Sequence, residues 1–298
     1  MSVAAPEATT LQIGALNLPA AEVQAIIDRA LAEDIAWGDV TTQALVPPHA
    51  RATAEALVKR PGVLAGIEVF AQTFRTLDPT VRVDVRVPDG ARVSPGDVVA
   101  VLEGRAAPML SAERVALNFL QRMSGTATAT AALVAVVGDR PARIIDTRKT
   151  APGLRILDKY AVRCGGGSNH RYNLADAVLI KDNHLAVAQR EGLTMADVIA
   201  RVRQRVSPFL KIEIEVESIA AAAEAAAAGA DLILLDNMAP AVMAEAVRAI
   251  AGRALVEASG GITLDSLAEV VASGVDLISS GALTHSVKAL DVSLDIQT

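Results

Sequence analysis

The chain has 298 residues, a formal net charge of −6, 52% hydrophobic residues and only 2% aromatic residues. This length allows one large domain or two smaller ones with a sizeable core, which must be built from Ala, Val, Leu and Ile. The acidic balance argues against a polyanion partner, and the scarcity of aromatic rings argues against single-stranded nucleic acid, so we expect no nucleic-acid partner.

Cysteine usage and hydropathy bear on the compartment. Cys164 is the only cysteine, which excludes an intrachain disulfide or a cysteine-based metal cluster and fits a reducing cytoplasm. Residues 1–11 lack the basic and apolar segments of a secretory signal, and no apolar run approaches the roughly 20 residues that a membrane helix needs. We therefore expect a soluble cytoplasmic protein with no membrane partner.

The first third of the chain predicts a small α/β domain. Residues 1–18 are expected to form a loose arm, and apolar residues at helical spacing predict a helix over 19–36. Trp37 interrupts this pattern and is expected to anchor a domain core or an interface, with ligand stacking as the alternative. Short strands follow between residues 50 and 104, of which 81–87 alternates strictly. These features predict an antiparallel sheet with the first helix packed against it.

Two helical segments are expected next, over 111–123 and 126–137, and a regular alternation of strands and helices begins after residue 140. Such alternation predicts parallel strands with crossover helices. Six strands at regular spacing favour a (β/α) barrel, for which fewer than eight strands fit the count. A doubly wound open sheet is the alternative, but no G-x-G-x-x-G follows a strand to support it. The expected strands are 142–146, 177–181, 209–216, 232–236, 254–258 and 275–279, and the helices between them are 154–163, 195–206, 218–228, 240–251 and 264–272.

Polar residues follow every one of these strands, where a (β/α) barrel places its functional groups. Five potential cations belong to the first two strand exits and to the glycine-rich segment between them. Such a cluster predicts a pocket for a small, highly anionic molecule. In chain order, the candidates are Arg148 and Lys149, His170 and Arg171, Lys181, Glu215 or Glu217, Asp236-Asn237, Ser259-Gly260-Gly261 and Ser279-Ser280-Gly281.

Several candidates have two interpretations. The glycines at 260, 261 and 281 could present backbone N–H groups to a phosphate, or form ordinary tight turns. Glu213, Glu215 and Glu217 share one face of a strand. A barrel interior cannot hold three unpaired carboxylates cheaply, so at least one should meet a cation or a hydroxylated ligand. A 21-residue step back from Asp236 selects Glu215, and this pair could accept hydrogen bonds from a ribose or help to hold Mg²⁺ through water.

The remaining candidates are less informative. Arg114 lies in the first turn of an expected helix and could be a solvated helix charge. His184 and His285 have no assigned role, and no histidine spacing indicates a transition-metal site. Cys164 lacks an evident base partner and is interpreted as a small packing residue.

Longer motifs of the chain resemble the quinolinate phosphoribosyltransferase family, the decarboxylating nicotinate-nucleotide pyrophosphorylases of NAD biosynthesis. The resemblance rests on D-T-R-K-T-x-P-G-L-R at 146–155, K-Y-A-V-R-C-G-G-G-S-N-H-R at 159–171 and L-I-K-D-N-H at 179–184. Further matching segments cover nearly the whole chain. Ala151 stands where such sequences commonly have threonine, and we expect little consequence.

The resemblance implies an N-terminal α/β sandwich domain over 1–125 and an incomplete, TIM-like (β/α) barrel over 126–280. It also implies that the tail, 281–298, returns to the N-terminal domain. A homodimer is expected, in which the N-terminal domain of one subunit closes the barrel mouth of the other. Such dimers could assemble further.

The implied reaction joins quinolinate to phosphoribosyl pyrophosphate with Mg²⁺ and yields nicotinate mononucleotide, pyrophosphate and carbon dioxide. By motif, the quinolinate carboxylates would be held by Arg114, Arg148, His170 and Arg171, with Arg114 reaching across the dimer. Lys149 and Lys181 would contact phosphoribosyl pyrophosphate, while Glu215 and Asp236 would bind the ribose side and organise Mg²⁺. The 5′-phosphate would be cradled by Ser259, Gly260, Gly261, Ser280 and Gly281.

Three other functions are considered. A paralogous pyrophosphorylase of the same fold, such as the molybdenum-transport-associated type, would use a different acceptor. A nicotinate-specific transferase would need one carboxylate clamp instead of two. A phosphate-ligand sensor on a barrel scaffold would bind without catalysis, but charged groups at six strand exits argue against it.

Overall fold

The computed structural model describes residues 18–297, so nearly all of the predicted N-terminal arm lies outside the described residues. The chain divides into two compact units. The first comprises residues up to 128 together with 152–165 and the segment from 287 onward, and the second comprises 129–151 and 166–286. Helix α4 (Ala106–Val137) contains the predicted domain boundary at 125/126.

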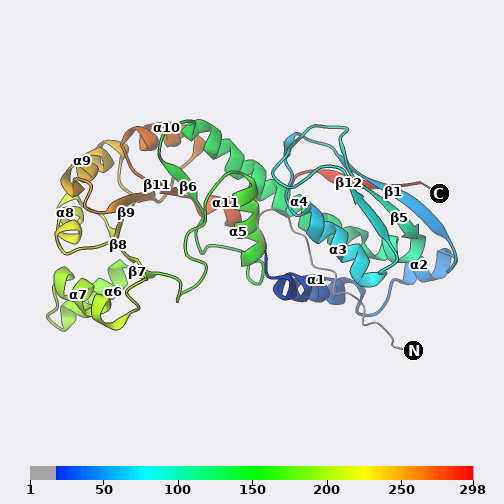
Figure 1. Cartoon of the computed structure of the whole chain (residues 1–298), viewed down its shortest axis with the longest axis horizontal. Coiled ribbons are helices and arrows are strands. Elements are labelled where there is room, and N and C mark those ends of the chain that lie inside the picture. The colour runs from blue at the N-terminus through cyan, green and yellow to red at the C-terminus, as the bar shows by residue number, and fades with distance from the viewer. Residues whose placement is uncertain (1–17, 298) are drawn as a thin grey trace, which may run out of the picture. The chain divides into compact units, whose positions relative to one another are not determined.

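The first unit is built on a four-stranded antiparallel sheet in the order β12-β1-β5-β3. The alternating burial of β1 (Arg51–Val58) places every second side chain in the core, as an amphipathic strand requires. The other strands are β3 (Arg82–Val85), β5 (Val98–Arg105) and β12 (Val292–Gln297). Because β12 pairs with β1, the end of the chain lies in the N-terminal sheet, as Figure 1 shows.

The helix at 67–77 packs against this sheet, and the helix at 20–35 packs on that helix and not, as predicted, on the sheet. Helix α1 (Ala20–Ile35) buries the apolar stripe that its sequence predicts, including Val23 and Ile27. Helix α3 (Ile67–Leu77) buries Phe70 and Phe74, whose rings meet edge to face with centroids 5.0 Å apart. Only strands were predicted for this region, although the apolar residues of α3 recur at helical spacing.

Helix α4 (Ala106–Val137) is one continuous element where the sequence predicted two. Gly125 lies in its middle, close to the backbone of Lys288 and Ala289. A Cβ at this position would lie only 3.0 Å from the Lys288 carbonyl carbon. The glycine therefore permits the close passage of the C-terminal segment and does not end the helix.

Two smaller elements complete the first unit, and one expectation for it is wrong. Helix α2 (Val40–Leu45) begins at Asp39, whose carboxylate accepts the Thr42 N–H as an N-cap. Strands β2 (Gly62–Val63) and β4 (Arg92–Val93) pair antiparallel. Trp37 is 98% exposed, so it does not anchor the core of this chain, and its interface role stays a prediction.

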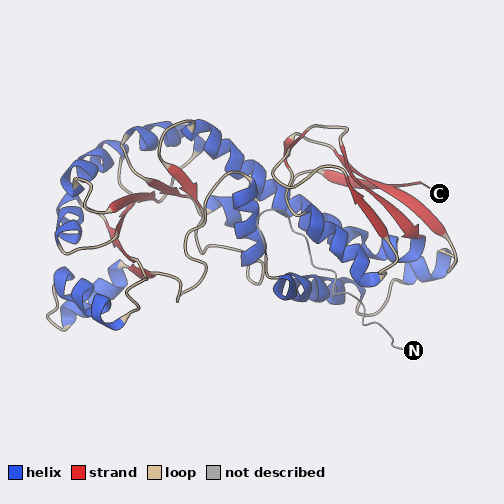
Figure 2. Ribbon diagram, viewed as in Figure 1, coloured by secondary structure: helices blue, strands red, loops and turns tan. Residues whose placement is uncertain are grey.

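The second unit contains six parallel strands in the order β6-β11-β10-β9-β8-β7. From β7 to β11 the order follows the sequence without reversal, and the helices lie outside the curved sheet (Figure 2). Strands β6 and β7 form its two ends, so the predicted incomplete barrel is confirmed and the doubly wound alternative is wrong. The strands are β6 (Arg143–Ile145), β7 (Val178–Ile180), β8 (Ile212–Val216), β9 (Leu232–Asp236), β10 (Leu255–Ser259) and β11 (Leu277–Ser279).

The helices between these strands largely follow the predicted pattern. Two short ones were not predicted: α6 (Asp182–Arg190), directly after Lys181, and α11 (Ala282–His285). The others are α7 (Met195–Arg205), α8 (Ile219–Ala227), α9 (Pro240–Ile250) and α10 (Leu264–Ala272), while α5 (Arg155–Cys164) belongs to the first unit. Within residues 18–297, every helix is too short or too polar to span a lipid bilayer.

Candidate functional site

A cavity of about 520 Å³ lies at the carboxyl ends of the barrel strands. Parallel strands all end on the same side of a barrel, so residues far apart in the sequence meet there. Arg148 and Lys149 after β6, Arg171 in the glycine-rich segment before β7, and Lys181 after β7 all line this one cavity. Its other lining residues are Thr147, His170, Leu179, Glu215, Leu234, Asp236, Asn237, Glu257, Ser259, Gly260, Gly261 and Ser279.

Asp146 joins the segment after β6, which carries Arg148 and Lys149, to the glycine-rich segment, which carries His170 and Arg171. It follows β6, is fully buried and accepts hydrogen bonds from Asn169 Nδ2 at 2.6 Å and from the His170 N–H at 2.9 Å. A parallel bridge between Ile145 and Ser168 extends this connection. The glycine-rich segment is thereby held beside the exit of β6. The cations of the two segments consequently lie at one site.

Arg171 is partly withdrawn from solvent in this arrangement. Its guanidinium donates a hydrogen bond to the Ala177 carbonyl at 2.9 Å. Burial, and then the neighbouring Arg148, lower the pKa of Arg171, while Glu213 opposes this shift. Two guanidinium groups close enough to repel each other form a site that an anion stabilises.

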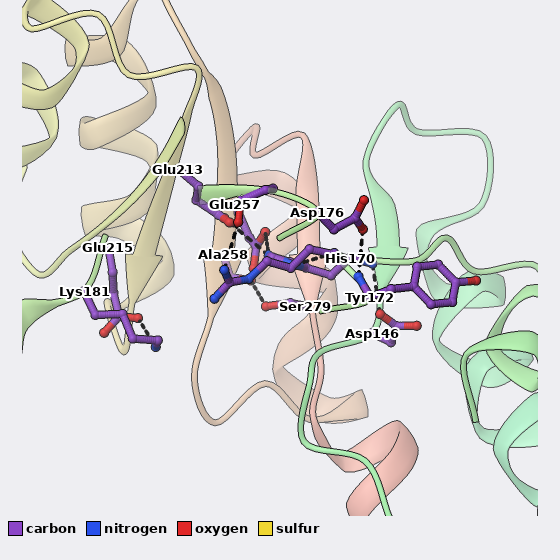
Figure 3. A network of polar contacts seen from close by, with 12 residues as sticks. Asp146, His170, Tyr172, Asp176, Lys181, Glu213, Glu215, Glu257, Ala258 and Ser279 are labelled. Carbon is purple, nitrogen blue, oxygen red and sulfur yellow. Dashed lines mark hydrogen bonds and ion pairs between the residues drawn. The ribbon is translucent and has the colours of Figure 1, made fainter. Parts of the chain in front are cut away.

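A carboxylate faces a lysine on the acidic side of the cavity. Lys181 Nζ lies 2.7 Å from Glu215 Oε2, as Figure 3 shows, and Asp236 follows on the next strand. Asn237 donates from Nδ2 to Asp236 Oδ2 at 2.7 Å and has a left-handed backbone with φ 53°. Asparagine tolerates this conformation better than most residues. Asn237 lines the cavity, as its predicted place at a strand exit indicates, although the sequence assigned it no separate role.

The glycine exit of β10 is tied to the exit of β9. Gly260 has φ 91°, and a Cβ there would collide with the Asn237 side chain. The Asn237 N–H donates to the Ser259 carbonyl at 3.0 Å. Gly261 has φ 61° and open space around it. These glycines thus leave backbone exposed to a ligand, as the phosphate interpretation requires.

Three predicted residues do not line this cavity. Ser280 is buried, and its N–H donates to the Ile145 carbonyl at 3.1 Å. Gly281 supports Lys149, because an added Cβ would lie 2.9 Å from Lys149 Cδ. Arg114 belongs to the first unit, where it lines a hollow of about 590 Å³ with Arg29, Glu33 and Arg122 among others.

Glu257 joins the site, although it is not among the residues predicted from the sequence. It is 1% exposed, and its Oε2 lies 3.6 Å from His170 Nε2. Glu213 Oε2 approaches the same nitrogen at 3.0 Å. A single carboxylate within the apolar strand L-V-E-A-S is a signal that could have identified Glu257, because such a residue needs a buried partner.

Two histidines left open by the sequence have local structural partners, and the predicted packing role of Cys164 fits its burial. The Lys181 N–H donates to His184 Nδ1 at 2.9 Å, so His184 caps helix α6. His285 Nδ1 lies 2.7 Å from Ser286 Oγ. Burial raises the pKa of the Cys164 thiol to about 12, which makes it an unreactive packing residue.

Comparison with known proteins covers both units. Residues 39–124 match the N-terminal domain model of quinolinate phosphoribosyl transferase, and residues 126–295 match its C-terminal domain model. A probable nicotinate-nucleotide pyrophosphorylase [carboxylating] from Bacillus subtilis is 42% identical over 92% of this chain and 93% of its own. The nicotinate-nucleotide pyrophosphorylase [carboxylating] from Mycobacterium leprae is 43% identical over 91% of this chain and 95% of its own.

Solved structures agree with these matches. The crystal structure of NadC from Streptococcus pyogenes has a TM-score of 0.88 and 42% identity, and covers 95% of this chain and 99% of its own. The nicotinate-nucleotide pyrophosphorylase from Pyrococcus furiosus has a TM-score of 0.66 at 17% identity, covering 94% of this chain and 78% of its own. The second match shows a shared fold alone.

Proposed function

Because the chain belongs to the quinolinate phosphoribosyltransferase family, we propose that it transfers the phosphoribosyl group of phosphoribosyl pyrophosphate to quinolinate with decarboxylation. The products are nicotinate mononucleotide, pyrophosphate and carbon dioxide. One observation carries this proposal: Arg148, Lys149, Arg171 and Lys181, from two strand exits and the glycine-rich segment between them, line a single cavity.

The charge of the cavity suits these substrates. Quinolinate carries two carboxylates and phosphoribosyl pyrophosphate carries several phosphate charges, so the two repel each other in solution. Cations around one cavity remove this repulsion and orient the reacting atoms. Guanidinium groups pair with carboxylates through two parallel hydrogen bonds, whereas lysine serves phosphate as a point charge. We assign the arginines to quinolinate and the lysines to phosphoribosyl pyrophosphate.

The chemistry needs positioned charge more than a protein nucleophile. When the ribose carbon bonds to the ring nitrogen, pyrophosphate leaves and the nitrogen becomes cationic. The positive nitrogen stabilises the electron pair that stays on the adjacent ring carbon as its carboxylate departs as carbon dioxide, and this carbon then takes up a proton. Lys149 and Lys181 would stabilise the charge that moves during the transfer, an effect that often supplies much of an enzymatic rate.

The remaining roles follow the motifs. Glu215 and Asp236 would accept hydrogen bonds from the ribose hydroxyl groups. His170 would complete the acceptor side, and Arg114 would reach quinolinate from a partner subunit. The 5′-phosphate would lie against Ser259, Gly260 and Gly261, with Ser280 and Gly281 behind them.

Mg²⁺ fits the donor set of the cavity. Hard cations prefer carboxylate oxygens and water, and Glu215 and Asp236 end adjacent strands at the cavity. Glu215 Oε2 already accepts from Lys181, which favours binding of the ion through water over direct coordination. When bound, Mg²⁺ would neutralise and orient the pyrophosphate oxygens.

A homodimer with shared sites is part of the proposal. Trp37, Val40 and Leu45 lie in and beside α2 and are 98%, 75% and 76% exposed. Exposed apolar groups gathered in this way are typical of interaction surfaces. Further assembly of such dimers and a cytoplasmic location stay predictions. The free, buried Cys164 is compatible with that location.

The decisive experiment combines purified protein, quinolinate, phosphoribosyl pyrophosphate and Mg²⁺. We expect equal amounts of nicotinate mononucleotide and carbon dioxide, with nicotinate as a poor substitute for quinolinate. Mononucleotide formation from nicotinate without carbon dioxide would instead indicate the nicotinate-specific transferase. Ligand binding with no pyrophosphate release would indicate a sensor, and release only with another acceptor would indicate a paralogous pyrophosphorylase.

A further inference from the structure

Two buried carboxylates converge on one imidazole inside the barrel. Glu213 lies on β8 and Glu257 on β10, yet both point inward to His170, as Figure 3 shows. Their Oε2 atoms lie 3.0 Å and 3.6 Å from His170 Nε2, and the two residues are 2% and 1% exposed. Burying two carboxylates is costly unless hydrogen bonds compensate, so this arrangement calls for a role.

The hydrogen bonds of His170 define its tautomer. Its Nδ1 accepts the backbone N–H of Arg171 at 2.7 Å, so Nδ1 carries no proton. The proton of the neutral ring therefore resides on Nε2, from which it is donated to Glu213. The backbone of His170 is fixed separately, because its N–H donates to Asp146 Oδ1 at 2.9 Å.

The chain of contacts leads to the anion cavity. Glu213 holds the ring, the ring accepts from Arg171, and the Arg171 guanidinium is held by the Ala177 carbonyl. His170 and Arg171 both line the cavity, whereas Glu213 does not. We propose that Glu213 and Glu257 are positioning residues that hold His170 in its Nε2–H tautomer and thereby fix Arg171 for quinolinate, which rests on the proposed function.

The two carboxylates have different parts in this arrangement. Glu213 is the nearer acceptor for Nε2–H. Burial, the Glu213 carboxylate and Asp146 raise the pKa of Glu257, whereas the Ser279 hydroxyl opposes the shift. This shift favours the protonated form of Glu257, which a glutamine of the same shape resembles. The charged and titratable groups facing this pair are Asp146, His170 and Arg171.

The first test is direct and needs no substrate. Nitrogen-15 spectra of the imidazoles in the full-length protein report which ring nitrogen of each histidine carries the proton, and a His170→Gln variant identifies its signals among the four histidines. We expect His170 neutral and protonated on Nε2 at pH 7. A ring protonated on Nδ1 or on both nitrogens overturns the proposal. A metal ion bound to Nε2 would displace its proton and overturns it too.

The second test measures binding at equilibrium. Glu213→Leu removes the acceptor, and we expect it to weaken quinolinate binding at least about tenfold while phosphoribosyl pyrophosphate binding changes less than about twofold, as loss of one charged hydrogen bond predicts. Glu213→Gln retains an acceptor oxygen and should restore most of the affinity. Glu257→Gln should bind quinolinate like the wild type, as should Glu217→Gln, an exposed control just beyond the same strand.

The outcomes separate this inference from the proposed function. If wild-type protein binds no quinolinate, the proposed function fails, but the tautomer spectrum still tests the hydrogen-bond chain. If quinolinate binds and folded Glu213→Leu has wild-type affinity, the positioning role is refuted. Should Glu213→Leu fail to fold, Glu257→Gln decides. A loss of quinolinate affinity as large as that expected for Glu213→Leu would contradict the assignment of Glu213 as the acceptor for His170 and of Glu257 as a residue that glutamine can replace.

Discussion

Lys181 and Glu215 face each other across the ends of β7 and β8, with 2.7 Å between Nζ and Oε2. The lysine side chain is 47% exposed, and exposed ion pairs contribute only about 0–1 kcal/mol to folding. The pair is therefore of little value for stability. Its position in the anion cavity indicates that each partner orients the other for substrates.

Glu215→Gln should uncouple this pair without unfolding the protein. We expect kcat/KM to fall about hundredfold, because the ribose side loses a charged acceptor. The free energy of unfolding, measured in urea, should change by less than about 1 kcal/mol. Glu217→Gln is the control and should leave both quantities unchanged. A stability loss with normal kcat/KM would show that the pair is structural.

Lys149→Ala should lower turnover and leave the fold intact. Lys149 is exposed at the cavity, so its removal creates no buried void. We expect kcat to fall about a hundredfold or more, the loss typical of one charge-stabilising group, and the melting temperature to stay unchanged. Lys211→Ala, an exposed lysine beside the start of β8, is the matched control. Near-normal kcat/KM would remove Lys149 from the catalytic set.

The sequence was sufficient for much of this site because alternation of strands and helices places each strand exit on the same side of a barrel. Lys181 and Glu215 were selected separately, and the structure brings them into contact. Tertiary relationships were harder to anticipate. Glu257 looked like one charge in an apolar strand, and only the curvature of the sheet brings it to His170.

The missed secondary structure has local physical causes. Helix α3 was interpreted as part of a strand-rich region, although its apolar residues recur at helical spacing around Phe70 and Phe74. The division of α4 in two reflects the usual view that glycine weakens a helix. At Gly125 the missing side chain instead admits the segment at Lys288, a contact that sequence alone does not reveal.

Gly260→Ala should be more harmful than Gly261→Ala. Both glycines have left-handed backbone, but an added Cβ at Gly260 would strike Asn237, whereas Gly261 has open space. We expect Gly261→Ala to cost about 1 kcal/mol of stability and Gly260→Ala about 2–3 kcal/mol with loss of phosphoribosyl pyrophosphate affinity. Urea unfolding and calorimetric titration measure the two effects. Equal costs at both positions would contradict the role of Asn237 in shaping this loop.

Asp78 should make stability depend on pH in the acid range. Its carboxylate is 1% exposed and accepts from Arg105 Nε at 2.8 Å, and this contact lowers the pKa of Asp78 to about 2 from 3.8. A folded-state pKa below the unfolded value stabilises the protein above the unfolded pKa, and the contribution disappears as pH falls through the folded one.

We therefore expect Arg105→Ala to be less stable than wild type at pH 7, with the difference shrinking between about pH 4 and pH 2. Urea unfolding at a series of pH values measures this convergence. Arg86→Ala, which removes a pair with the exposed Asp84, serves as the control and should have little effect. A stability difference that stays constant down to pH 2 would show that Arg105 acts through packing.

Arg114→Ala should weaken quinolinate far more than phosphoribosyl pyrophosphate, because a guanidinium pairs with a carboxylate in a geometry that no other group reproduces. The residue is exposed in the first unit, so the fold should persist. If Arg114 serves the site of a partner subunit, a heterodimer of Arg114→Ala and Lys149→Ala has both changes in one site and neither in the other. Random mixing should then restore about a quarter of wild-type activity from two inactive proteins, as two-fold symmetry requires. Mixtures that stay inactive although subunits demonstrably exchange would place Arg114 and Lys149 in a site of one chain.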